Sequence, residues 1–250
     1  MLFNRSGVCA ADAASVTRAQ DIATRLDLPY SVEADQFDVA LMVSENESWL
    51  RRFSKPVMDW HIDFLSPAYR EKRAKRTRKN DTLSRALGLH KKAQSRVLDM
   101  SAGLGKDAYW IAYCGASVTL IERNPILAFL LEEAIHALRL DPIEGAIGNR
   151  MTLVKADASS FLETVNAGQF DVAYYDPMFM PRRKSALVKK DMQIMHDLLG
   201  EDPMANLLEK TLEKIPCLVV KRAKSDPPYH PSMHHDAQTG TTRYEIYRKI

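Results

Sequence analysis

Two glycines that follow a short apolar segment mark the first place where this sequence has the residues for ligand binding. Asp99 lies within the segment Val97–Met100, and Gly103 and Gly105 come shortly after it. Glycine permits a tight turn and lets a ligand lie against the backbone. With Ala108, the glycines match a dinucleotide-binding pattern in which alanine replaces the third glycine. Asp99, Gly103 and Gly105 are therefore candidate cofactor contacts, although a glycine turn without a ligand has the same spacing.

Two further carboxylates stand where a nucleoside cofactor needs them. Glu122 ends the next strand-like segment, 23 residues after Asp99, and Asp157 follows the third one. A carboxylate in the position of Glu122 can accept hydrogen bonds from both hydroxyls of a ribose, a device that sites for NAD and for S-adenosylmethionine (AdoMet) share. Asp157 can reach an adenine amino group, and a solvated helix N-cap is its alternative role.

The segment Asp176-Pro177-Met178-Phe179 has the most specific chemistry. It is close to the (Asp/Asn)-Pro-Pro-aromatic signature of AdoMet-dependent amino methyltransferases, and an ordinary Asp-Pro turn is the alternative. The exocyclic amine of a nucleobase is a poor nucleophile because its lone pair is delocalised into the ring. The Asp176 carboxylate and the Pro177 carbonyl can accept its two protons and aim the lone pair at a methyl group, while Phe179 stacks on the base. The position of the motif, after the glycine turn and both carboxylates, favours AdoMet over a dinucleotide.

Strand and helix patterns alternate from residue 96 onward. A repeated β-α-β pattern predicts a parallel, doubly wound sheet that binds ligands at the carboxyl ends of its strands. With the motifs above, the pattern predicts an α/β, Rossmann-like fold that resembles class I AdoMet-dependent methyltransferases, and this resemblance implies a mainly parallel seven-stranded sheet. The predicted strands are Arg96–Met100, Ser117–Ile121, Met151–Val154, Phe170–Tyr175, Cys217–Lys221 and Thr241–Tyr247. One helix is predicted to follow the glycine turn and to end near Cys114. The other predicted helices span Pro125–Leu140, Ser159–Val165, Lys189–Leu199 and Met204–Lys214.

The first 75 residues lack the regular alternation of strands and helices that the rest of the chain shows. A helix is predicted over Ala13–Leu26, and short strand-like runs follow at Phe37–Val43, Trp49–Phe53 and Val57–Phe64. The charged segment Tyr69–Asp81 fits either a helix or a loop. We therefore expect a small N-terminal α/β domain over residues 1–75, a candidate for RNA contact, and a Rossmann-like methyltransferase domain over residues 76–250.

Positive charge is concentrated in two stretches, although the net charge of the chain is only +3. Between Arg51 and Lys92 there are 13 lysines and arginines against 4 acidic residues. Such concentration indicates a polyanionic partner, RNA or DNA, with a solvated helix face as the alternative. The residue types do not distinguish RNA from DNA. The candidate RNA contacts are Arg73 and Arg76 in the first stretch, and Arg182, Arg183, Lys184, Lys189 and Lys190 in the second.

The composition of the 250 residues, 46% hydrophobic and 27% charged, is that of a globular protein and excludes a disordered or collagen-like chain. No apolar run reaches the ~18 residues of a membrane span, and the first residues do not resemble a secretory signal. The three cysteines are far apart, and the seven histidines show no metal-binding spacing. We therefore expect a cytoplasmic protein without a disulfide scaffold, a metal site or a membrane segment.

The chain resembles the RsmJ (YhiQ) family of bacterial 16S ribosomal RNA guanine-N2 methyltransferases over roughly residues 57–247. The Met of Asp-Pro-Met-Phe together with the run Lys184–Lys190 is the most specific part of the resemblance. The other segments that carry it are Asp99–Ala108, Glu122–Pro125 and Val219–Arg222. The family commonly has Arg where Lys106 stands and a Ser-Ser pair where Asp157-Ala158 stands.

The resemblance implies an enzyme that uses AdoMet to methylate N2 of one guanine near the 3′ end of 16S ribosomal RNA. The partner would be this RNA or the small ribosomal subunit, and a monomer is favoured. The cofactor contacts that the resemblance implies are Lys106, Asp107, Glu122, Arg123, Asp157, Ala158 and Asp176.

Two other function classes stay open. One is a methyltransferase that acts on another substrate, such as adenine in DNA or a protein side chain. The other is a Rossmann-like RNA-binding protein without catalysis, against which the intact Asp176–Phe179 motif argues. The basic stretches favour nucleic acid over a small molecule, and only the family resemblance favours RNA over DNA.

Overall fold

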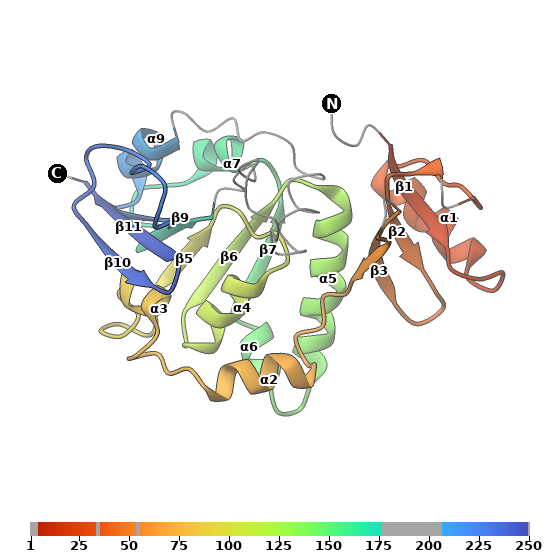
Figure 1. Ribbon diagram of the computed structural model, residues 1–250, viewed down its shortest axis with the longest axis horizontal. Coiled ribbons are helices and arrows are strands. Elements are labelled where there is room, and N and C mark those ends of the chain that lie inside the picture. Colours follow the sequence, from red (N-terminus) through yellow and green to blue (C-terminus); the bar gives the residue numbers. More distant parts are fainter. Residues whose placement is uncertain (1–4, 34–35, 54–55, 177–206, 250) are drawn as a thin grey trace. The chain divides into compact units, whose positions relative to one another are not determined.

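The computed structural model describes residues 5–33, 36–53, 56–176 and 207–249 (Figure 1). The chain forms two compact units, of which the first contains residues up to Ile62 together with residues 124–130, and the second begins at Asp63. The predicted division at residue 75, as a boundary between independently folding domains, stays a prediction. None of the helices in the described ranges is long and apolar enough to cross a membrane.

The first unit is built on a four-stranded sheet in the order β1-β2-β3-β4. Its strands are β1 (Ser6–Ala10), β2 (Val39–Val43), β3 (Ser48–Arg52) and β4 (Met58–Trp60). β1 and β2 are parallel and are joined through helix α1 (Val16–Leu26), whereas the other pairs are antiparallel. The predicted helix and three predicted strands are present. The fourth strand, β1, has no alternating pattern and was not predicted.

Helix α1 starts three residues later than predicted. The Asp12 carboxylate accepts a hydrogen bond from the Ser15 backbone N–H at 2.9 Å, so these residues form a turn ahead of the helix. Strand β4 is also shorter than the predicted run Val57–Phe64, because only three of its residues pair with β3.

The second unit contains a seven-stranded sheet in the order β10-β11-β9-β8-β5-β6-β7. Strands β5 to β9 are parallel to one another, and β11 is antiparallel to both β9 and β10. The predicted fold class is therefore confirmed. The strands are β5 (Arg96–Asp99), β6 (Ser117–Glu122), β7 (Met151–Lys155), β8 (Val172–Tyr175), β9 (Cys217–Ala223), β10 (His235–Thr239) and β11 (Thr242–Arg248).

The helices of this part of the chain connect the strands (Figure 1). The ambiguous segment Tyr69–Asp81 is helical up to Ala74, and the two shortest helices, α3 and α6, were not predicted. The predicted helix Lys189–Leu199 lies outside the described residues. The helices are α2 (Pro67–Ala74), α3 (Thr82–Ala86), α4 (Lys106–Tyr113), α5 (Pro125–Leu140), α6 (Gly145–Gly148), α7 (Ala158–Thr164) and α9 (Leu207–Lys214).

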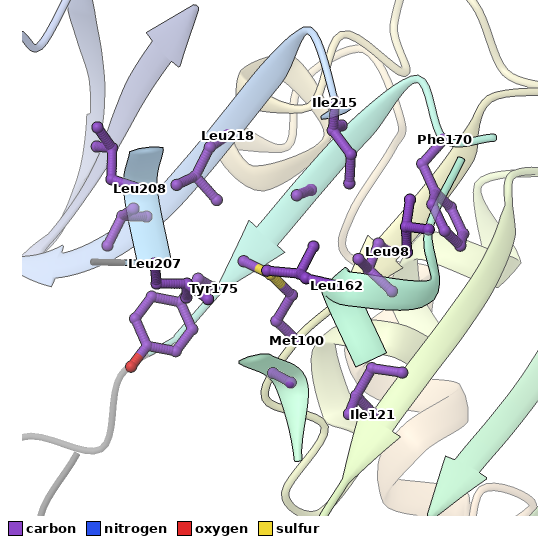
Figure 2. Packing of buried hydrophobic residues seen from close by; sticks show 14 of the residues in the cluster. Leu98, Met100, Ile121, Leu162, Phe170, Tyr175, Leu207, Leu208, Ile215 and Leu218 are labelled. Atoms are coloured by element: carbon purple, nitrogen blue, oxygen red, sulfur yellow. The ribbon is translucent and has the colours of Figure 1, made fainter. Parts of the chain in front are cut away.

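Strand alternation sorts the sheet residues between a packed core and the opposite face. Leu98, Tyr175 and Leu218 point toward α7 and α9, where they pack with Leu162 and Leu207 (Figure 2). Successive residues of a strand point to opposite faces of the sheet. The residues one position along, Asp99 in β5 and Tyr174 in β8, therefore face the other way. In β9, Leu218 and Val220 belong to the core, so Lys221 faces the same side as Asp99 and Tyr174. Both Tyr174 and Lys221 contact Asp107 of helix α4.

Candidate active site

The carboxyl ends of four neighbouring strands bring the predicted acidic residues to one edge of the sheet. Asp99 ends β5, Glu122 ends β6, Asp157 follows β7 and Asp176 follows β8. These strands are parallel and adjacent in the order β7-β6-β5-β8. In open α/β sheets this edge is where ligands bind. The structure thus places these four side chains along one edge, as the sequence predicted.

The glycine loop between β5 and α4 needs glycine for two reasons. Gly103 and Gly105 have φ angles of 54° and 69°, which side chains disfavour. A Cβ atom on Gly105 would also stand only 2.6 Å from Leu131 Cδ2 and 2.9 Å from Phe64 Cζ. The Gly103 backbone N–H donates a hydrogen bond to Glu122 Oε2 at 2.9 Å. The loop is therefore held against the end of β6 by the same carboxylate that was predicted to bind a ribose.

Asp99 and Glu122 are both almost completely buried, at 1% and 4% exposure. Asp99 Oδ1 accepts a hydrogen bond from the Ser101 backbone N–H at 3.1 Å. Burial nevertheless raises the pKa of the Asp99 carboxyl to about 8, and nearby Asp107 and Asp176 add to the rise. Asp99 is thus largely protonated at neutral pH. A cationic group beside it would favour the ionised form.

Lys221 joins two carboxylates from distant parts of the chain. Its Nζ atom lies 2.7 Å from Asp176 Oδ2 and 2.9 Å from Asp107 Oδ2. The Tyr174 hydroxyl donates to the same oxygen of Asp107 at 2.6 Å. We call these four residues the Lys221 network. The side chains of Asp107, Asp176 and Lys221 are 25–31% exposed, so the network is accessible to a ligand.

The ionisable groups of the Lys221 network shift one another's pKa values. Burial raises the pKa of Asp176, and the nearby Asp107 charge raises it while Lys221 opposes the rise. Burial has the same tendency at Asp107, but Lys221 and the Tyr174 hydroxyl outweigh it and hold the pKa of Asp107 below its usual value. Against its own burial, the two carboxylates raise the pKa of Lys221 well above normal. At neutral pH the network therefore contains an ammonium group between two carboxyl groups.

Ser101 links the glycine loop to the amine-binding motif predicted from sequence. Its hydroxyl oxygen accepts a hydrogen bond from the Asp176 backbone N–H at 2.7 Å. The start of the Asp176–Phe179 segment is therefore fixed beside the loop. Pro177 and Phe179, the other predicted catalytic residues, lie outside the described residues.

The structure gives Asp157 the helix-capping role that was its alternative assignment. Its carboxylate accepts hydrogen bonds from the backbone N–H groups of Ser159 at 2.9 Å and Ser160 at 3.4 Å, at the start of α7. Its other oxygen lies 3.9 Å from Arg123. The cap and a contact to adenine are compatible, because the carboxylate has two oxygens. The predicted cofactor contacts of Asp157 and Arg123 stay predictions.

Two predicted cofactor residues stand at the first positions of helices. Lys106 is exposed at the start of α4. Ala158 begins α7, and its methyl group is buried in the core between the helix and the sheet. Ala158 therefore offers a ligand only its backbone, and both contacts stay predictions.

Arg73 and Arg76 have intramolecular partners. Arg73 lies 2.9 Å from Glu144 Oε2 and donates a hydrogen bond to the Tyr109 hydroxyl at 3.2 Å. Arg76 pairs with Asp81 at 2.6 Å, and its guanidinium lies 3.9 Å from the centre of the Trp110 ring. RNA contact by either arginine stays a prediction. The five basic residues predicted from the second stretch lie outside the described residues.

Sequence reasoning assigned no role to Lys221, Tyr174 or Ser101. One signal for Lys221 was available, since this lysine directly follows the apolar run Leu218–Val220, which is fully buried. A charged residue at the carboxyl end of a buried parallel strand is a candidate for the ligand site. Its partners, Asp107 and Asp176, are far away in the sequence.

The amino-acid sequence is similar to a family of methyltransferases along most of its length. A family model described as a putative SAM-dependent methyltransferase matches residues 21–249. A ribosomal RNA small subunit methyltransferase J from Coxiella burnetii is 33% identical to this chain, with 94% of this chain and 93% of the relative covered. The protein of the same name from Pseudomonas paraeruginosa is 35% identical, with 92% and 90% covered.

Among solved structures, a SAM-dependent methyltransferase from Neisseria gonorrhoeae is similar to this chain. The TM-score is 0.71 and the sequence identity is 22%, with 96% of this chain and 95% of that chain covered. This similarity shows that the two proteins share a fold.

Proposed function

This chain belongs to the SAM-dependent methyltransferase family that contains the ribosomal RNA small subunit methyltransferases J, and on that premise we propose that it methylates the N2 amine of a guanine in 16S ribosomal RNA. The family resemblance drawn from the motifs is thereby confirmed, and AdoMet is the cofactor of the family. The names of relatives that match over nearly the whole chain support small-subunit ribosomal RNA as the substrate. The choice of guanine N2 is supported by the motif resemblance.

The residues at the strand ends fit AdoMet. The glycine loop lies at the carboxyl end of β5, and Glu122 offers a buried carboxylate next to it. AdoMet is a nucleoside with a cationic amino acid end, so it needs both a ribose acceptor and nearby acidic groups. Glu122 would hold the ribose and Asp157 the adenine. Asp99, which ionises more readily beside a cation, would lie near the amino acid end.

The single observation that carries the proposal is the position of Asp176. It directly follows β8, its backbone is fixed by Ser101 of the glycine loop, and its carboxylate is held by Lys221. A fixed acceptor beside the cofactor loop is what an amine methyltransferase needs, because orientation of the amine supplies much of the rate.

In the proposed reaction, AdoMet supplies a methyl group bonded to a positively charged sulfur. Asp176 accepts a hydrogen bond from one amine proton, the Pro177 carbonyl accepts the other, and Phe179 stacks on the base. The nitrogen lone pair forms the new C–N bond while the C–S bond breaks and its electron pair stays on sulfur. Positive charge then develops on the amine, and the Asp176 carboxylate stabilises it. The amine becomes acidic as it is alkylated, so it loses one proton without a strong base.

Under the same proposal, the protein acts in the bacterial cytoplasm as a monomer on 16S ribosomal RNA or on the assembled small subunit. The basic residues of the second stretch would contact phosphates and place the target guanine at Asp176. Phosphate contacts position a nucleic acid without reading its sequence.

The experiment that tests the proposal is methyl transfer from tritiated AdoMet onto small ribosomal subunits from cells that lack the gene. We expect tritium in 16S ribosomal RNA at a single nucleotide, which nuclease digestion and mass spectrometry identify as N2-methylguanosine. Subunits from cells with the gene are the matched control and should accept little label, since their site is already methylated. Label in DNA or protein, or none at all in the subunits, would contradict the proposal.

A further inference from the structure

The contacts of Lys221 exceed what the proposed chemistry has used so far. Asp176 comes from the end of β8 and Asp107 from the first turn of α4, and the Lys221 ammonium bonds to both. On the neighbouring strand, Tyr244 is the direct cross-strand partner of Lys221. The lysine thus ties together three elements at the edge where the ligands bind.

We propose that Lys221 is a positioning residue for methyl transfer, whose ammonium group holds the Asp176 carboxylate in the orientation and charge state needed to accept a proton of the base amine. The bond to Lys221 uses Oδ2 of Asp176, and Oδ1 is the oxygen assigned to the amine. This inference rests on the proposed function, since it gives Asp176 the role described there.

The geometry supports a role in orientation. Asp176 is fixed at two points, by the Ser101 hydroxyl at its backbone N–H and by Lys221 at its carboxylate. Fixing the backbone alone would leave the side chain free to rotate between rotamers. A catalytic group works best when surrounding hydrogen bonds lock its rotamer. The ion pair with Lys221 therefore fixes the direction of the Asp176 carboxylate as well as its position.

The charges support a role in ionisation. Asp107 and Asp176 both lie within hydrogen-bonding distance of one Nζ atom, so the two carboxyl groups are neighbours. Two carboxylates that share a site without a cation disfavour ionisation of each other, and one of them retains its proton to higher pH. A protonated Asp176 would donate a hydrogen bond to the amine nitrogen and occupy the lone pair that has to attack. Lys221 prevents this by compensating one of the two negative charges.

Other titratable groups face the same cluster. Tyr174 from β8 bonds to Asp107, and Tyr244 from β11 lies beside Lys221, each with a pKa raised above normal chiefly by burial. Asp99 from β5 interacts electrostatically with Asp107 and Asp176. Arg76 is a further cation that lowers the pKa of Asp107. None of these groups bonds to the Asp176 carboxylate, so Lys221 is the residue whose removal should change Asp176 most.

The test compares Lys221→Met and Lys221→Arg with the wild-type protein, each checked for folding by circular dichroism. The first readout is the pH dependence of single-turnover methyl transfer to small ribosomal subunits. Activity requires ionised Asp176, so it rises with pH through the pKa of that carboxyl. Loss of a neighbouring opposite charge shifts a carboxyl pKa upward by about 1–3 units. For Lys221→Met we expect the acid limb to move up by at least about one pH unit, with kcat lowered and KM for the subunit unchanged.

The second readout does not depend on activity. In protein labelled with 13C at the aspartate carboxyl carbons, the Asp176 resonance is identified by its loss in Asp176→Asn. Its titration midpoint should rise in Lys221→Met, stay near wild type in Lys221→Arg and fall in Asp107→Asn, where the like charge is removed. Lys224→Met, which changes an exposed lysine just after β9, is the matched control and should leave both readouts unchanged.

The outcomes separate this inference from the proposed function. If the wild-type protein methylates the subunit but the midpoint and the acid limb stay the same in folded Lys221→Met, the positioning role is wrong and the function stands. If the wild-type protein does not methylate ribosomal RNA, the function fails, and with it the role of Lys221 in the reaction. A uniform loss of rate at every pH in folded Lys221→Met, without a shift of the midpoint, would mean that Lys221 does not set the charge state of Asp176 and would overturn that part of the inference.

Discussion

Substitution of Glu122 by glutamine should weaken AdoMet binding without loosening the glycine loop. Glu122 is 4% exposed, and its Oε2 atom accepts a hydrogen bond from the Gly103 backbone N–H at 2.9 Å. The amide oxygen of glutamine can keep this bond. Glutamine has no negative charge, however, and its NH₂ group donates where the second carboxylate oxygen would accept a ribose hydroxyl.

The size of the effect follows from the hydrogen bond that is lost. A hydrogen bond to a charged group contributes about 1.5–3 kcal/mol, which corresponds to a weakening of about 10- to 150-fold. Glu122→Ala should be more severe, since it also leaves the buried Gly103 N–H without its acceptor and adds about 1–3 kcal/mol of destabilisation. The glutamine variant therefore separates cofactor binding from loop stability, whereas the alanine variant mixes the two.

Isothermal titration calorimetry with AdoMet measures the effect directly. The matched control is Glu132→Gln on α5, where the glutamate pairs with Lys155 and its side chain is half exposed. This control should bind AdoMet as the wild-type protein does. If folded Glu122→Gln binds AdoMet with wild-type affinity, Glu122 serves only to anchor the glycine loop, and the assignment of the ribose site is wrong.

Three further predictions concern charges elsewhere. Burial tends to raise the pKa of Asp171, but bonds to Arg96 and Lys92 hold this pKa at about 2. Asp171→Asn should therefore lower the free energy of unfolding at pH 7 by about 1 kcal/mol, given partial solvent screening. In urea titrations the difference from wild type should shrink as the pH falls from about 4 towards 2. Burial raises the pKa of Asp99 to about 8, so folding favours the neutral form of this carboxyl. As the pH rises from 6 to 8, Asp99→Asn should therefore gain about 2 kcal/mol of unfolding free energy relative to wild type. If the difference between the two proteins does not change with pH, Asp99 is already ionised in the folded protein. Removal of the charges of Arg182, Arg183 and Lys184 should weaken RNA binding and reduce its dependence on salt while AdoMet affinity stays the same, and an unaltered salt slope would return these residues to the solvated-face alternative.

The sheet and its long helices were predictable because their patterns are local. Helix α5 begins at Pro125 and ends at Leu140, as its apolar periodicity and first-turn proline predicted. β10 was missed because His235–Thr239 is a polar strand at the edge of the sheet and contains no apolar pattern. β1 was missed because its small residues do not alternate. In both strands the pairing with a neighbour, and not the composition, defines the element.

The positions of the candidate site residues were predictable, but the side-chain contacts between distant segments were not. Strand ends of a parallel sheet meet at one edge, so Asp99, Glu122 and Asp176 followed from the order of the elements. The ion pairs of Lys221 did not, because they join residues on three elements and depend on side-chain direction. The same limit applies to the bond between Arg73 and Glu144, which joins residues far apart in the chain. The RNA contact predicted for Arg73 stays a prediction.

The central claim is that Asp176 orients the amine that receives the methyl group, and single-turnover methyl transfer to small ribosomal subunits at saturating AdoMet tests it most directly. Groups that stabilise developing charge in other enzymes contribute about 10²–10³ in kcat. Folded Asp176→Ala should therefore lose at least about 10² in rate, while Asp176→Asn, which keeps one acceptor oxygen, should lose less. A wild-type rate in folded Asp176→Ala would show that Asp176 begins an ordinary turn, and the catalytic assignment would fall.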